Sequence, residues 1–218
     1  MIGNSATSKQ ARTVAIGNEA QTLHTSAIAI GDKAYSNGAR GIAIGRNAQS
    51  KGNNSIALGS GDQNDGKKTT ADKDYAVAIG SDAVANIANG IALGSESKTT
   101  ATSASGQSGF DASQEAEGVR KNKYNGLTGK NLPSNLAGLS IGNDGKTRQI
   151  NHLAAGKADD DAVNVAQLKS VNLAFKGDNN TKGDVRLHDQ RLSVVGAANS
   201  FITTTASDKK LEISTTQG

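Results

Sequence analysis

The most regular feature of the chain is a short apolar segment that recurs between residues 14 and 142. Each copy places a β-branched residue or leucine on both sides of a small residue and then ends in glycine, as in Ile28-Ala29-Ile30-Gly31. Large residues two positions apart have the period of a β-strand, so each copy predicts a short strand with large side chains on one face and a small one on the other. Uninterrupted copies stand 14 residues apart, and the closing glycines are Gly17, Gly31, Gly45, Gly59, Gly80, Gly94 and Gly142.

The closing glycine indicates a corner, because glycine suits a backbone with positive φ or a close approach of another chain segment. A weaker half-repeat follows the corner, in which two polar residues precede an alanine. Its copies are Asn18-Glu19-Ala20, Asp32-Lys33-Ala34, Arg46-Asn47-Ala48 and Ser81-Asp82-Ala83. Each repeat therefore predicts two short strands and two turns, which together make one coil of a solenoid.

One coil cannot fold alone. Two buried aliphatic side chains contribute roughly 3–6 kcal/mol, whereas ordering a 14-residue repeat costs about 14–28 kcal/mol of backbone entropy. Stacked coils gain ladder hydrogen bonds and a continuous apolar column, so residues 1–142 are predicted to form a parallel β-roll. The opposite strand face then carries a row of alanines that meets either a second copy of the chain or solvent; its members are Ala29, Ala43, Ala57, Ala78 and Ala92.

Two insertions interrupt the period. Gly59 and Gly80 are 21 residues apart, and the polar excess predicts a surface loop at about residues 60–74. Gly94 and Gly142 are 48 residues apart, which predicts a second insertion at 95–138. This insertion holds a basic and aromatic cluster that is our candidate site for an acidic ligand: Arg120, Lys121, Lys123 and Tyr124. The alternative is a solvated loop that packs on its own roll.

Residues 143–172 differ in pattern from the roll. Asp159, Asp160 and Asp161 precede an apolar run, an arrangement typical of a helix start. Val165, Leu168 and Asn172 stand at i, i+3 and i+7, so we expect a short helix that begins a three-stranded coiled coil. Residues 173–218 alternate apolar and polar residues around polar turns at 179–180 and 207–208, which predicts a small β-rich module.

The residues at 161–168 read DAVNVAQL, and together with the AIAIG-type repeats they resemble the trimeric autotransporter adhesins with YadA-like heads. The resemblance implies a β-dominated homotrimer with three parts: a left-handed parallel β-roll head at 1–142, a neck at 143–172 and a β-rich stalk module at 173–218. It also implies that Val163, Val165 and Leu168 take part in trimerisation. The implied function is attachment at the bacterial cell surface to a host extracellular matrix protein or cell-surface receptor, with auto-aggregation as a further activity. The signal peptide and the C-terminal outer-membrane anchor of the family are expected outside this sequence.

Composition narrows the function classes. Aromatic residues make up 3% of the chain and Trp and Cys are absent, which disfavours an ordinary globular core and excludes disulfides. The charge of +4 is spread along the chain. The chain has no basic run with interleaved aromatic residues, which is the pattern that would predict nucleic-acid binding. The basic surplus nevertheless predicts that binding to any acidic partner weakens as salt rises.

We expect no catalytic residue, no metal and no cofactor. His24, His152 and His188 stand in three different modules, without paired ligands at metal-binding or catalytic spacing. The acidic triplet at 159–161 lacks the spaced oxygens of a calcium loop. Two alternatives to an adhesin remain: a structural spacer in a longer fibre and, less favoured by the residues, a carbohydrate-active β-solenoid enzyme.

Overall fold

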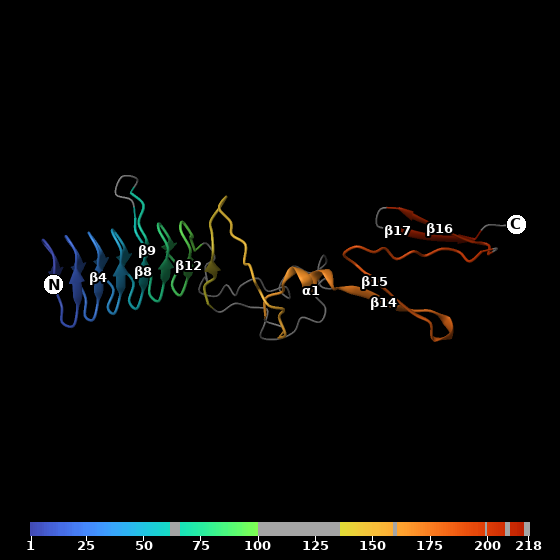
Figure 1. Cartoon of the computed structure of the whole chain (residues 1–218), viewed down its shortest axis with the longest axis horizontal. Helices are drawn as coiled ribbons and strands as arrows, with labels where there is room; N and C mark the ends of the chain where they lie inside the picture. Colours follow the sequence, from blue (N-terminus) through green and yellow to red (C-terminus); the bar gives the residue numbers. More distant parts are fainter. Residues whose placement is uncertain (62–65, 100–135, 159–160, 199, 208–209, 216–218) are drawn as a thin grey trace, which may run out of the picture. The chain divides into compact units, whose positions relative to one another are not determined.

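The chain folds into two units, Met1–Ile150 and Asn151–Gly218, in a computed structural model (Figure 1). The structure describes residues 1–61, 66–99, 136–158, 161–198, 200–207 and 210–215. The first unit is a stack of coils, each built from one strand of three residues and one of two. Among the described residues, no helix is long and apolar enough to cross a membrane.

Two parallel sheets run along the stack. The seven-stranded sheet consists of β2 (Val14–Ile16), β4 (Ile28–Ile30), β6 (Ile42–Ile44), β8 (Ile56–Leu58), β10 (Val77–Ile79), β12 (Ile91–Leu93) and β13 (Leu139–Ser140). The six-stranded sheet consists of β1 (Thr7–Ser8), β3 (Gln21–Thr22), β5 (Tyr35–Ser36), β7 (Gln49–Ser50), β9 (Thr70–Ala71) and β11 (Val84–Ala85). Equivalent repeat positions pair, as Ile28 does with Ile42, and pairing continues across both insertions through Gln49–Thr70 and Ile91–Leu139. The predicted parallel β-roll is confirmed.

The interior of the roll corrects the predicted orientation of the strands. The alanines of the longer strands are buried, with Ala29, Ala43 and Ala57 at 0% exposure, whereas the flanking Ile and Leu side chains point outward. The shorter strands also turn small residues inward, such as Thr22 and Ser36. Both sheets line one narrow interior, so no fully buried side chain in the described part of the roll is larger than threonine, and the aliphatic column lies outside.

The corner glycines adopt the conformation that their position in the repeat predicts. Gly31 has φ of +130°, and a Cβ built on it would lie 2.6 Å from the carbonyl oxygen of Gly45 in the next coil. Two residues later most coils have a second residue with positive φ, such as Glu19 or Lys33, both of which are exposed. The glycines therefore stack closely along one corner, while the neighbouring corner presents polar side chains.

The second unit holds a short helix and two hairpins. Helix α1 (Val165–Lys169) is followed by β14 (Asn172–Lys176) and β15 (Lys182–Arg186), joined through a 3-10 turn at Asp178–Asn180. Strands β16 (Ile202–Ser207) and β17 (Lys210–Thr215) form the second antiparallel hairpin. The β-rich tail is confirmed, but the helix ends before Asn172, which is already in β14. The predicted heptad spacing through Asn172 is therefore wrong.

Candidate functional site

An apolar face covers the outside of the seven-stranded sheet. Each full strand contributes two large side chains to it, and they remain partly accessible; Ile44 and Ile91 are 38% exposed and Leu93 is 45% exposed, whereas those of β4, β8 and β10 are half-buried. The strands pair in register, so these side chains form two continuous rows along the roll. An apolar surface of this kind on a single chain marks an interaction site. We call it the aliphatic face.

The segment around α1 separates its polar and apolar residues. Asn164 caps the helix by accepting from the backbone N–H of Gln167 at 2.9 Å, and the Gln167 side chain exchanges two hydrogen bonds with the backbone of Gly156. The Asn164 amide also donates to the Leu153 carbonyl at 3.1 Å. Asn164 and Gln167 thus hold the preceding segment, residues 153–156, against the helix. The predicted trimerisation residues remain outside and are 66–67% exposed: Val163, Val165 and Leu168.

Asp161 does not act as the sequence predicts. Its carboxylate accepts hydrogen bonds from the backbone N–H groups of Lys157 and Ala158 at 2.8 and 2.9 Å, which lowers the pKa of that carboxyl. The helix begins three residues later with Asn164 as its N-cap, and its first turn contains no acidic residue. Asp161 therefore stabilises a turn before the helix instead of the helix terminus. Asp159 and Asp160 lie outside the described residues.

A basic hollow of about 670 Å³ lies on the outward face of the six-stranded sheet. Its floor is a register-matched row of Gln49, Thr70, Val84 and Lys98. Its lining contains five lysines and two carboxylates, and we call it the lysine groove: Lys51, Lys67, Lys68, Lys98, Lys146, Asp82 and Glu96. Lys51 forms a 3.0 Å ion pair with Asp72, and Lys146 pairs with Glu96. The positive electrostatic potential of these ammonium groups would attract an anionic ligand.

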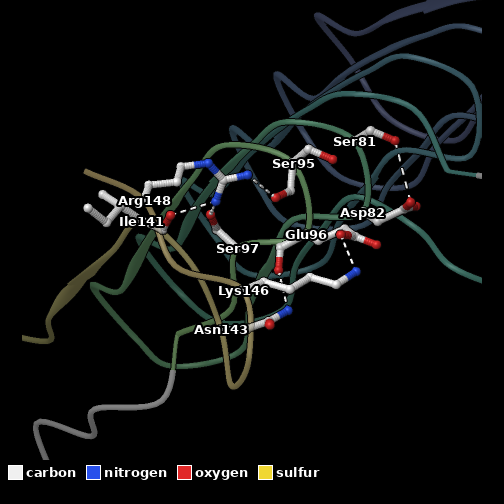
Figure 2. Close-up of polar contacts among 9 residues, drawn as sticks. All are labelled: Ser81, Asp82, Ser95, Glu96, Ser97, Ile141, Asn143, Lys146 and Arg148. Atoms are coloured by element: carbon white, nitrogen blue, oxygen red, sulfur yellow. Dashed lines mark hydrogen bonds and ion pairs between the residues drawn. The ribbon is translucent and has the colours of Figure 1, made fainter. Parts of the chain in front are cut away.

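The last coil is closed by a clasp that comes from residues 141–148 (Figure 2). The Arg148 guanidinium donates to the carbonyl oxygens of Ile141 and Ser95, both at 2.5 Å, and to the Ser97 hydroxyl at 3.1 Å. Asn143 donates to the Glu96 carbonyl at 2.6 Å. Arg148 also lies against Gly94, where the corner of a further coil would otherwise stack. The clasp thus satisfies carbonyl groups at the end of the roll.

We expect Arg148→Gln to destabilise the last coil by about 1–2 kcal/mol, because the charged hydrogen bonds of the guanidinium to two carbonyl groups and a hydroxyl are lost. Hydrogen exchange should become faster at the amides of Leu93, Gly94 and Ser97, with little change in β4 and β6. Arg46→Gln, at an exposed corner of the roll, is the matched control. Equal exchange in the two variants would contradict a closing role for Arg148.

Glu96 makes the clasp sensitive to pH. The hydrogen bond and charge of Lys146 lower the pKa of Glu96, and Lys67 and Arg148 add to this effect. A carboxyl with a lowered folded-state pKa stabilises the fold above its unfolded pKa, and this contribution disappears as pH falls through the folded value. We therefore expect the melting temperature of the wild type to exceed that of Glu96→Gln at neutral pH, and the difference to vanish under acid conditions. A difference that persists in acid would contradict the ion pair as its source.

Comparison with known proteins agrees with the fold and the repeat. The model of the YadA head domain repeat matches residues 2–20, 25–48, 36–61 and 71–97. The structure is similar to the collagen-binding domain of the Yersinia adhesin YadA, with 32% sequence identity and a TM-score of 0.51, over 77% of this chain and 71% of that one. This chain belongs to the YadA-like trimeric autotransporter adhesins. The autotransporter adhesin BadA of Bartonella henselae is also similar, with 48% identity over a 60-residue alignment that covers 22% of this chain and 2% of BadA.

The candidate ligand residues of this YadA-like chain divide between two regions. Arg120, Lys121, Lys123 and Tyr124 lie outside the described residues, so their role stays a prediction. The lysine groove was missed by sequence reasoning, which treated the stretch around Lys67 and Lys68 only as a surface loop. The available signal was register: Lys98 falls at the repeat position of Val84, and Lys51 stands two residues beyond Gln49, directly after β7.

Proposed function

We propose that this chain is the head and upper stalk of a homotrimeric surface adhesin that attaches bacteria to a host extracellular matrix protein. The observation that carries the proposal is the aliphatic face, which the chain leaves exposed along a roll similar to a collagen-binding domain. Three copies that pack these faces together would remove the rows from water, at roughly 25 cal/mol per Å² of apolar area. The exposed Val163, Val165 and Leu168 support the same assembly in the second unit.

The trimer would present each binding surface three times. Weak contacts with a repetitive matrix fibre then combine into strong attachment, because later contacts form at high effective concentration. We propose collagen as the first ligand to test, since the similar YadA domain is described as collagen-binding. In this proposal the chain acts by binding rather than by catalysis, and it belongs to the surface-exposed passenger region of its protein. The proposed division is head at 1–142, neck at 143–172 and stalk module at 173–218.

We expect the purified trimer to bind immobilised collagen in a surface plasmon resonance assay that also includes fibronectin and laminin. Monomeric chain should bind at least about tenfold more weakly, because avidity is lost. Binding to none of the matrix proteins would contradict the proposal and favour the spacer. Whole-cell adhesion of bacteria that display the chain gives the corresponding measurement for a cell-surface receptor.

The insertion at 95–138 has its own test. If Arg120, Lys121, Lys123 and Tyr124 contact the ligand, their combined replacement with alanine should weaken collagen binding while the sedimentation of the trimer stays the same. A second variant replaces residues 101–135 with a short Gly-Ser linker and leaves Leu139 available to pair with Ile91. Unchanged binding by both variants would exclude the insertion as the ligand site without affecting the proposed trimer.

A further inference from the structure

The lysine groove has a charge and shape that the proposed attachment to matrix protein does not use. Its lysines come from separate places along the chain: Lys51 follows β7, Lys67 and Lys68 precede β9, and Lys98 and Lys146 belong to the last coil and its clasp. The floor crosses three inter-strand steps from Gln49 to Lys98, which is roughly 14 Å at the usual strand spacing. The roll thus lines up ammonium groups over a length suited to an extended chain, not to a single ion.

We propose that the lysine groove binds a sulfated polysaccharide. Lysine ammonium groups act as point charges that suit sulfate groups spaced along a polymer. Within the described part of the chain, no carboxylate lies in ion-pair range of Lys68 or Lys98, whereas Lys51 and Lys146 are each held in an ion pair. The Gln49 amide on the floor can hydrogen-bond sugar hydroxyls, and Val84 offers an apolar contact to the C–H face of a sugar ring.

The groove fits other polyanions less well. Its described lining contains no aromatic side chain, although proteins that bind single-stranded nucleic acid usually stack bases on aromatic rings. An acidic peptide could not add itself as a strand, because β9 is paired on both sides, with β7 and β11. Recognition therefore falls mainly to side chains, which are ammonium, amide and hydroxyl groups together with the carboxylates of Asp82 and Glu96, the latter paired with Lys146. These groups favour a sulfated sugar chain over a nucleic acid or a peptide.

The groove also stays accessible in the proposed trimer. The two sheets of the roll share one interior, so the outward face of the six-stranded sheet and the aliphatic face point away from each other. Assembly through the aliphatic face would therefore leave one groove per protomer open to solvent. Three grooves on one trimer could engage the same long polysaccharide and gain avidity. The proposal does not depend on binding to collagen.

The test measures binding of the full chain to a heparin oligosaccharide of defined length by surface plasmon resonance. We expect Lys68→Gln/Lys98→Gln to weaken the wild-type affinity by about tenfold, and Lys68→Arg/Lys98→Arg to keep it near the wild-type value. The affinity should fall as salt rises, with a smaller slope for the glutamine variant. Collagen binding should be the same in all three proteins, which separates this test from that of the proposed function.

The matched control is Lys157→Gln/Lys176→Gln, which removes the same charge from two exposed lysines of the second unit. The proposal is overturned if the wild type does not bind the oligosaccharide or if the control weakens binding as much as the groove variant. It is also overturned if a fully desulfated oligosaccharide, a single-stranded oligonucleotide or polyglutamate binds as tightly as the sulfated sugar. Circular dichroism and sedimentation would verify that each variant keeps its fold and oligomeric state.

Discussion

Leucine in place of Ala43 is expected to destabilise the roll by roughly 3 kcal/mol or more, or to prevent its folding, because the interior has no room for a larger side chain. Ala43 is fully buried between Ala29 and Ala57 of the neighbouring strands. The shorter strands face it across the interior with residues such as Ser36 and Ser50, which are held by hydrogen bonds. An inserted leucine would have to separate the two sheets, and the strain would extend to the adjacent coils.

Thermal denaturation followed by circular dichroism measures this effect. Ala88→Leu is the matched control, because it makes the same change at an exposed turn of the same roll. We expect the control to melt within a few degrees of the wild type. If Ala43→Leu were equally harmless, the alanine row would be on the surface, as the repeat alone suggested, and the assignment of the interior would be wrong.

Much of the fold was predictable from the spacing of glycines. The 14-residue period of Gly17, Gly31 and Gly45 predicts one coil per repeat and a parallel register, and both are observed. The period determines the register because equivalent residues must stack. The presence of an insertion after Gly59 was equally readable, but its predicted bounds of 60–74 are too wide, because β9 (Thr70–Ala71) lies within them and pairs in register with β7.

The Ile-Ala-Ile pattern by itself could not predict which face of each strand is buried. Alternation identifies two faces, but burial depends on what covers each one, and large residues were assumed to be inside. The second half-repeat held the correcting signal. Ala20 and Thr22, like Ala34 and Ser36, are small residues two positions apart, and they have to face the same interior as the alanines of the longer strands. An interior that is narrow on one side leaves little room for isoleucine on the other.

The lysine groove was less predictable for a different reason. Lys51 and Lys98 follow from the register of the repeat, but Lys67 belongs to an insertion and Lys146 reaches the groove through its pair with Glu96, 50 positions away in sequence. A period determines which repeat residues are neighbours. It cannot predict which side chains an insertion or a closing segment brings beside them.

The double variant Ile44→Glu/Leu168→Glu is expected to raise the dissociation constant of the proposed trimer at least about a thousandfold. Each protomer would bring two unpaired carboxylates into apolar contacts. Ile44 lies on the aliphatic face and Leu168 on the exposed side of α1, so the double variant tests the proposed assembly surface of both units. Each single variant should weaken assembly less than the double variant, since the other unit keeps its contacts. Within a protomer both side chains already face outward, so the fold of the separate chain should survive.

Sedimentation velocity over a range of protein concentrations measures this dissociation, with circular dichroism as the test of folding. The matched control is Gln21→Glu/Asn151→Glu, which places the same charges on the outward face of the six-stranded sheet and on an exposed residue of the second unit. We expect the control to sediment as the wild type does. A double variant that remains trimeric would show that neither the aliphatic face nor the exposed side of α1 is the assembly surface. An unfolded double variant would show that Ile44 and Leu168 stabilise the protomer itself, which also contradicts the proposed assembly surface.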